Sequence, residues 1–179
     1  MSHKQNVARV ICHELAHQWF GNLVTMDWWS QLWLNEGFAS FMQYFSADAI
    51  EPELSIWNLY MTREYANAFK LDGMSSSHAI EVPVLTAKGA DEVFDIISYC
   101  KGSCVIVMLQ SFLGDDAFQK GLIDYLNKFA YSNAVTTDLW HHLSQSSDKD
   151  VGKIMQCWTR SQGFPVIEAE ITDKANGKI

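Results

Sequence analysis

The sequence lacks an excess of basic residues and any long apolar run. Lys and Arg together number 13 against 21 Asp and Glu, so the formal net charge is −8 at pH 7. A general nucleic-acid binder carries a basic patch and a high isoelectric point, so we expect no nucleic-acid partner. The longest apolar run is Cys104–Leu109. It is much shorter than the ~18 residues that span a bilayer, so we expect no membrane partner.

An export signal and a disulfide pattern are also missing. Residues 1–6 are polar, and no apolar segment of roughly 7–15 residues with a cleavage site follows them. The cysteine spacing matches no disulfide framework, although Cys100 and Cys104 would share a helix face, so we expect reduced thiols. Both observations favour a cytoplasmic location. The four cysteines are Cys12, Cys100, Cys104 and Cys157.

What the sequence does contain is the composition of one globular domain. Its 179 residues are 48% hydrophobic and 19% charged, which is enough apolar material for a single sizeable core. Seven Trp and ten Phe indicate that large side chains fill that core.

The residues that carry chemistry lie between positions 13 and 36. If residues 7–20 form a helix, His13 and His17 lie one turn apart on the same face, and their imidazoles can converge on one ion. Glu36 can supply an oxygen ligand from a second helix. Two His and one Glu leave the fourth tetrahedral position open for water, as in a catalytic zinc site. The alternative is a chance H-E-x-x-H match on a partly polar helix face, which arises roughly once in a hundred such chains.

Hydrophobic periodicity predicts a mainly α fold. Apolar residues recur at helical spacing, and capping Asp and Thr residues or terminating Gly and Pro residues separate the segments. The stretch 74–92 has no such period, so we expect a long loop there. The expected helices cover residues 7–20, 32–50, 52–71, 94–113, 115–129, 137–146 and 150–162, with Asp115 and Asp116 expected to cap the fifth.

Two further expectations concern the ends of the sequence. The helix over 7–20 should be buried on two sides, because it has one apolar stripe beside a second one. Residues 167–172 alternate apolar and polar side chains, which predicts a half-buried strand with no partner. This orphan strand and the short segment before His13 lead us to expect a fragment of a larger enzyme. The first stripe consists of Val7, Val10, Ile11, Leu15 and Trp19, and the second of His13, His17 and Phe20.

Two sequence blocks resemble the zinc signature of the gluzincin aminopeptidase family. They are H-E-L-A-H-Q-W-F-G-N-L-V-T over 13–25 and W-L-N-E-G-F-A over 33–39. The resemblance implies that residues 1–165 are the helical, zinc-bearing lobe of a thermolysin-like catalytic domain without its N-terminal β-rich half. Residues 166–179 would then begin a following β-sandwich. The similarity continues through Ser77-His78, Ile80-Glu81, Phe94-Asp95, Ile97-Ser98-Tyr99, Lys101-Gly102, Asp138-Leu139-Trp140 and Gly163-Phe164-Pro165.

The same resemblance implies a mechanism and a substrate class. His13, His17 and Glu36 would hold one Zn²⁺ per chain, with Glu14 as the general base. Tyr99 matches the family's oxyanion donor, although from the residues alone a core phenol is the simpler interpretation. The substrates would be peptides with a free N-terminus.

One departure from the family limits this expectation. The family binds the substrate's α-amine through a Gly-x-Met-Glu-Asn motif upstream of the zinc helix, and this sequence contains none. We therefore expect weak activity from the chain alone. Two alternatives stay open, namely a catalytically inactive zinc-binding fragment that acts as an interaction module, and a metal-free helical scaffold. Lys101 either sets the local field around Tyr99 or is a solvated lysine.

Overall fold

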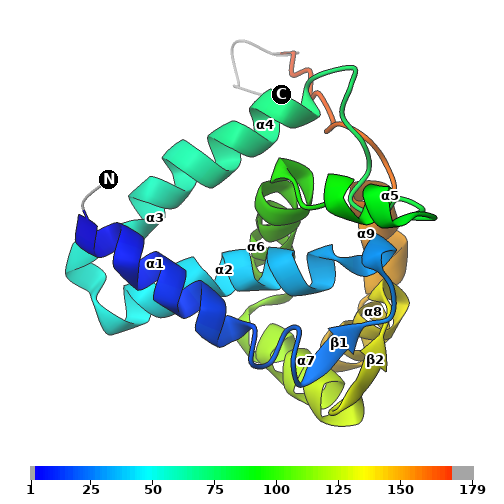
Figure 1. The fold of residues 1–179 in the computed structure, drawn as a ribbon, viewed down its shortest axis with the longest axis horizontal. Helices are drawn as coiled ribbons and strands as arrows, with labels where there is room; N and C mark the ends of the chain where they lie inside the picture. The colour runs from blue at the N-terminus through cyan, green and yellow to red at the C-terminus, as the bar shows by residue number, and fades with distance from the viewer. Residues whose placement is uncertain (1–2, 171–179) are drawn as a thin grey trace.

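The structure is a computed structural model that describes residues 3–170. Within this range it confirms the mainly α fold, with one short two-stranded parallel sheet (Figure 1). The α-helices are α1 (His3–Ala16), α2 (Trp33–Ile50), α3 (Ile56–Tyr60), α4 (Ala66–Asp72), α5 (Ala87–Glu92), α6 (Gly102–Leu113), α7 (Asp115–Lys128), α8 (Thr136–Ser147) and α9 (Val151–Thr159). The strands are β1 (Val24–Met26) and β2 (Ser132–Ala134), the 3-10 turns η1 (Trp29–Gln31) and η2 (Pro52–Leu54), and the π turns η3 (Met61–Tyr65) and η4 (Ile97–Lys101).

Helix α2 crosses the middle of the molecule, between α1 and α6 (Figure 1). Four of its five aromatic residues point inward at helical spacing and are almost fully buried, whereas Phe45 is 45% exposed. The indole N–H of Trp33 donates to the Thr136 hydroxyl at 2.9 Å, which ties α2 to the start of α8. The core around α2 includes Trp33, Phe38, Phe41, Ile97, Ile106, Leu109, Leu139 and Leu143.

The small sheet fixes the chain just after α1. β1 pairs with β2 in parallel register, with Val24 opposite Ser132 and Met26 opposite Ala134. This pairing anchors the segment that leaves α1 to the connection between α7 and α8. The segment that carries His17 is therefore fixed by α1 on its N-terminal side and by the β1–β2 pairing on its C-terminal side.

The first helix differs from its prediction in two ways. It ends at Ala16 rather than residue 20, because the N–H groups of Gln18 and Trp19 turn to acceptors three residues back and tighten the chain into a turn. Burial on two sides is also wrong, because only Cys12 and Ala16 of α1 are buried. Periodicity identifies an apolar face but not what covers it. Between 41% and 55% of each side chain is exposed at Val7, Val10, Ile11, Leu15 and Trp19.

Other predicted boundaries and caps also differ from those in the structure. The helix expected over 52–71 begins as the 3-10 turn η2, which the left-handed Ser55 separates from a continuous helical run over 56–72. The expected loop over 74–92 contains α5, whose N-terminus Thr86 caps by accepting from the Gly89 N–H at 3.1 Å. Asp115 and Asp116 do not cap α7, because Gly114 occupies the cap position and both lie in the first turn.

The predicted C-terminal strand is not seen over residues 167–170, which have no regular structure. Ile167 is 87% exposed, and no strand of the described residues runs beside this segment, so it makes no ladder hydrogen bonds. Residues 171 and 172 of that prediction lie outside the described range.

The helices of the described residues differ in length and in apolar character. No single helix there is long and apolar enough to cross a membrane, although the bent pair Ile97–Leu113 and Asp115–Lys128 together has the length and composition.

Candidate metal centre

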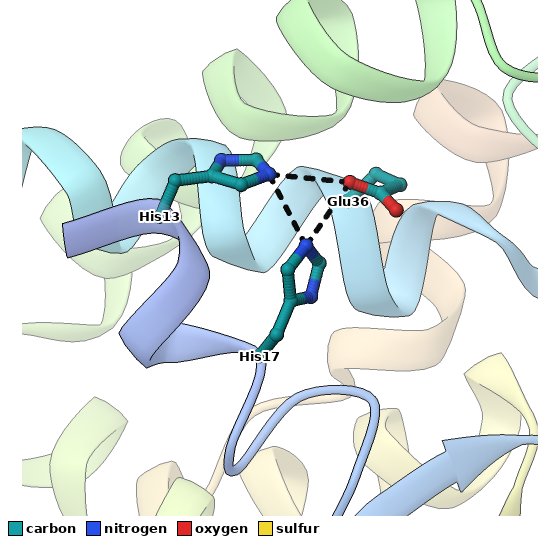
Figure 2. A group of neighbouring side chains, drawn as sticks. All are labelled: His13, His17 and Glu36. Carbon is teal, nitrogen blue, oxygen red and sulfur yellow. Dashed lines mark hydrogen bonds and ion pairs between the residues drawn. The ribbon is translucent and has the colours of Figure 1, made fainter. Parts of the chain in front are cut away.

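The turn after α1 places His17 one helical turn beyond His13. The main-chain N–H of His17 donates to the His13 carbonyl at 3.2 Å, although α1 has ended at Ala16. The chain then reverses at Gly21, whose φ of +138° is rarely adopted by residues that carry a Cβ. The two imidazoles therefore point toward one another and toward α2 (Figure 2).

Glu36 meets these two imidazoles from the first turn of α2 (Figure 2). Its Oε2 atom lies 3.4 Å from the Nε2 of His13 and 3.4 Å from the Nε2 of His17. The two Nε2 atoms are 3.2 Å apart. The three atoms form a nearly equilateral triangle, and among the described residues this is the group of His, Cys, Asp and Glu side chains placed to hold a metal ion.

The triangle has the size that a zinc ion requires. Zn–N and Zn–O bonds of about 2.0–2.1 Å in a tetrahedral site put neighbouring ligand atoms roughly 3.3 Å apart. The observed edges of 3.2, 3.4 and 3.4 Å match one face of such a tetrahedron. Glu36 Oε2 is also buried without a hydrogen-bond partner in the described structure. Such an atom is costly unless a cation or donor satisfies it.

A hydrogen bond from Nδ1 of His17 leaves its Nε2 available to bind a metal. Its Nδ1 lies 3.0 Å from the carbonyl oxygen of Phe20. A carbonyl can only accept, so Nδ1 carries the proton and donates it. In the neutral ring the Nε2 lone pair is then left for a metal.

The electrostatics of the triangle keep Glu36 ionised. Burial would raise the pKa of its carboxyl, but the neighbouring imidazoles of His13 and His17 outweigh burial and lower the pKa to about 2. Glu36 in turn raises the pKa of His17. The site therefore presents a carboxylate at neutral pH.

Tyr99 stands beside the triangle on the π turn η4. Its ring is nearly parallel to that of His13, at 9° with the centroids 6.2 Å apart. Burial, and then the nearby Glu36 carboxylate, raise the pKa of the Tyr99 phenol well above its usual value. The hydroxyl therefore keeps its proton at neutral pH and can donate a hydrogen bond.

A polar cleft of about 320 Å³ adjoins the triangle. His13, Glu14 and Tyr99 all line it, so the residues expected as ligand, base and oxyanion donor share one cavity. Glu14 is exposed at its mouth. The structure thus brings together all five residues that the sequence singled out. The remaining wall includes Arg9, Gln43, Ser40, Arg63, Glu64 and Asn67.

The structure rules out one of the two expectations for Lys101. It is 5% exposed, so it is not a solvated lysine. Its Nζ lies 2.8 Å from the buried Asp72 carboxylate and donates to the carbonyls of Ser161 and Gly163. Its charge is therefore paired with Asp72, and it joins α4 and η4 to the segment after α9.

Sequence reasoning assigned no role to His78 and Asp95. The structure places His78 Nε2 2.7 Å from Asp95 Oδ2, at the start of the helical run that carries Tyr99. Both residues lie in blocks that resemble the gluzincin family, and that was the only signal available. Their contact joins a loop to a helix start, which residue periodicity does not reveal.

Two histidines and a glutamate at ligand spacing, beside a cleft with a carboxylate and a protonated phenol, are the arrangement typical of metal-dependent hydrolases. The chain belongs to peptidase family M1, since residues 1–158 match the Peptidase family M1 domain. This match confirms the resemblance seen in the two signature blocks.

Curated relatives agree with this family. The chain is 51% identical over 175 residues to Aminopeptidase 2, mitochondrial, of Saccharomyces cerevisiae, covering 98% of the chain and 18% of the relative. It is 53% identical over 172 residues to Aminopeptidase M1 of Arabidopsis thaliana, covering 96% and 20%. It is 52% identical over 166 residues to the Alanine/arginine aminopeptidase of Saccharomyces cerevisiae, covering 93% and 19%. The chain thus spans about a fifth of the length of these relatives.

Proposed function

We propose that this chain is the metal-bearing helical lobe of a zinc aminopeptidase that hydrolyses the N-terminal residue from peptides. One observation carries the proposal, namely that the ligand triangle adjoins the cleft that holds Glu14 and Tyr99. His13 belongs to both. The names of the relatives, all aminopeptidases, support peptides with a free N-terminus as substrates.

The proposed chemistry divides among a metal and two residues. One zinc ion per chain, held by His13, His17 and Glu36, would supply a Lewis acid that activates water and polarises the scissile carbonyl. Glu14 accepts the proton of the attacking water and passes it to the leaving amine. The Tyr99 hydroxyl donates a hydrogen bond to the carbonyl oxygen as negative charge develops there.

Two finer assignments belong to the same proposal. Residues 1–165 would be the helical part of a thermolysin-like domain, and residues 166–179, of which 171–179 lie outside the described range, would lead into a following β-sandwich. The location is cytoplasmic, which the four free cysteines support. One relative is named mitochondrial, so cell fractionation with antibodies to this chain is the direct test of the location.

Metal content and substrate preference test the proposal together. We expect one zinc per purified chain, slow release of N-terminal residues by the chain alone, and no cleavage of the matched N-acetylated peptide. Activity should rise in the protein that contains this chain, because the chain has no amine-binding Gly-x-Met-Glu-Asn motif. A zinc content well below one per chain, or equal cleavage of the acetylated peptide, contradicts the proposal.

A second candidate is a zinc-binding interaction module without turnover. It is favoured by an apolar groove of about 610 Å³ between α1, α2 and α7, beside the exposed Leu15 and Trp19. Full zinc loading without turnover, in the chain and in the protein that contains it, would favour this candidate.

A further inference from the structure

One loop residue, His78, holds the start of the helical run that carries Tyr99. Its Nε2 lies 2.7 Å from Asp95 Oδ2. The other carboxylate oxygen of Asp95 accepts from the main-chain N–H groups of Ile97 at 3.0 Å and Ser98 at 3.1 Å. The main-chain carbonyl of Asp95 accepts from the Tyr99 N–H at 3.1 Å. Asp95 thus caps this run with its side chain, and His78 holds the cap in place.

The hydrogen-bond partners determine the protonation state of His78. Its Nδ1 lies 2.7 Å from the carbonyl oxygen of Ala79, which can only accept. Its Nε2 faces the Asp95 carboxylate, which accepts as well when ionised. Both ring nitrogens therefore donate, so His78 is an imidazolium in this arrangement.

The charges around His78 favour the same state. The hydrogen bond to Asp95 is the largest cause that raises the pKa of His78, against burial and the Lys101 charge, which lower it. Lys101 is itself paired with Asp72. Asp72 also accepts from the hydroxyl of Ser77, which anchors the residue just before His78.

The first turn of this run takes its two side-chain cap hydrogen bonds from Asp95. Ile97–Lys101 is a π turn, a rare geometry that occurs frequently at functional sites. Ile97 and Ser98 are buried, whereas Tyr99 faces the cleft. A shift of the capped N–H groups therefore moves the Tyr99 ring relative to His13 and Glu36.

We propose that His78, in its charged form, is a positioning residue that acts through Asp95 to hold Tyr99 at the metal centre. The role of Tyr99 rests on the proposed function, but the mechanical link from His78 to η4 does not. About 31% of the His78 side chain and 26% of the Asp95 side chain are exposed, so the pair can be altered without opening the core.

Amide exchange in the chain tests the link without any need for activity. In His78→Gln, which donates but does not titrate, we expect weaker protection of the Ile97 and Ser98 amides and no pH dependence of that protection above neutrality. The wild-type chain should lose protection as His78 deprotonates. His141→Gln on the exposed surface of α8 is the matched control and should behave as wild type. Wild-type protection and wild-type pH dependence in His78→Gln would overturn the proposal.

Kinetics in the protein that contains this chain test the consequence for Tyr99. We expect kcat of His78→Gln to fall roughly 10- to 100-fold with little change in KM or zinc content, because misplacement affects the transition state most. The alkaline limb of its kcat profile should also disappear. An unchanged kcat with an unchanged alkaline limb would overturn the positioning role. A wild-type protein with no aminopeptidase activity would instead overturn the proposed function, and the exchange experiment would still decide the link.

Discussion

Gly37 of α2 and Gly102 of α6 lie face to face where the helix of Glu36 crosses the helical run of Tyr99. A Cβ on Gly37 would come within 3.3 Å of the Cα and carbonyl carbon of Gly102. A Cβ on Gly102 would come within 3.3 Å of the Gly37 Cα. A Cβ at either position would require the facing backbone to give way by a few tenths of an ångström, and the crossing sets the separation of Tyr99 from Glu36.

Gly37→Ala should therefore force the two helices apart. Alanine gains about 1 kcal/mol of helix propensity, but the new methyl group meets backbone atoms that cannot rotate away. We expect a net loss of about 1–3 kcal/mol in the free energy of unfolding, measured by urea denaturation. Gly152→Ala is the control, because its Cβ would meet other atoms at 3.8 Å or more. Equal stability of the two variants would contradict the close-approach argument.

Gly21→Ala should weaken metal binding without touching a ligand. The new Cβ would lie 3.5 Å from His17 Nδ1, at a φ of +138°. Because a residue with a Cβ is strained at this φ, the backbone at Phe20 and Gly21 would shift and disturb the hydrogen bond between His17 and Phe20. Losing such an outer hydrogen bond typically costs 10- to 100-fold in metal affinity. Zinc titration against a competing chelator measures the effect, and His17→Ala should lose more. Wild-type affinity in both variants would refute the ligand assignment.

Glu14→Gln should separate metal binding from catalysis. Glutamine leaves His13, His17 and Glu36 unchanged but cannot accept a proton, so zinc content should stay at the wild-type level. We expect kcat to fall about 10²- to 10⁴-fold, the usual contribution of a general base. Metal analysis and peptide turnover on the same preparation provide the test. Substantial activity in this variant would show that another residue is the base.

Lys101→Met should destabilise the chain strongly. It leaves the Asp72 carboxylate, which is 4% exposed, without its cation, and breaking a buried pair this way costs about 3–5 kcal/mol. The double variant with Asp72→Asn should recover part of the loss, because the buried charge is then removed. Lys120→Met is the control. Its pair with Asp124 is exposed, at 3.9 Å, and its loss should cost less than about 1 kcal/mol. A similar loss in both single variants would argue against a buried pair.

The stability of the chain should depend on the charge of His78 above pH 6.5, its ordinary pKa. Its pKa is raised above the ordinary value of 6.5 by the hydrogen bond to Asp95. The folded state then binds the proton more tightly than the unfolded state does. The stabilisation is fully present below pH 6.5 and is lost as pH rises through the raised pKa. The melting temperature of the wild type relative to His78→Gln should therefore fall over that range, and a constant difference would contradict it.

The spacing of residues predicted the convergence of His13, His17 and Glu36 better than it predicted the surroundings of these three residues. His13 and His17 are one helical turn apart in any local geometry close to a helix, so their convergence survived the early end of α1. Glu36 followed because a second amphipathic helix was clear from its aromatic residues. The H-E-x-x-H pattern and the aromatic period are local, and local patterns are what a sequence displays.

The missed features depend on contacts between distant segments. His78 and Asp95 are 17 residues apart, and Lys101 and Asp72 lie on different elements. No period links either pair. The exposed stripe of α1 was misjudged for a related reason, since apolar spacing does not say which neighbour covers a face. The π turn around Tyr99 has the same composition as an ordinary helix and leaves no separate signal.

The position of the ligand triangle between α1 and α2 gives a bound ion a second effect. Within the described residues only Cys12 and Ala16 of this helix are buried, whereas His13 and Glu36 face each other across the contact with α2. An ion bound to both would join α1 to α2 in the folded chain alone, so its binding free energy would add to the stability of that contact. The metal would then stabilise the packing of the N-terminal helix α1. Its removal would lower the stability of that helix more than the stability of the core around α2.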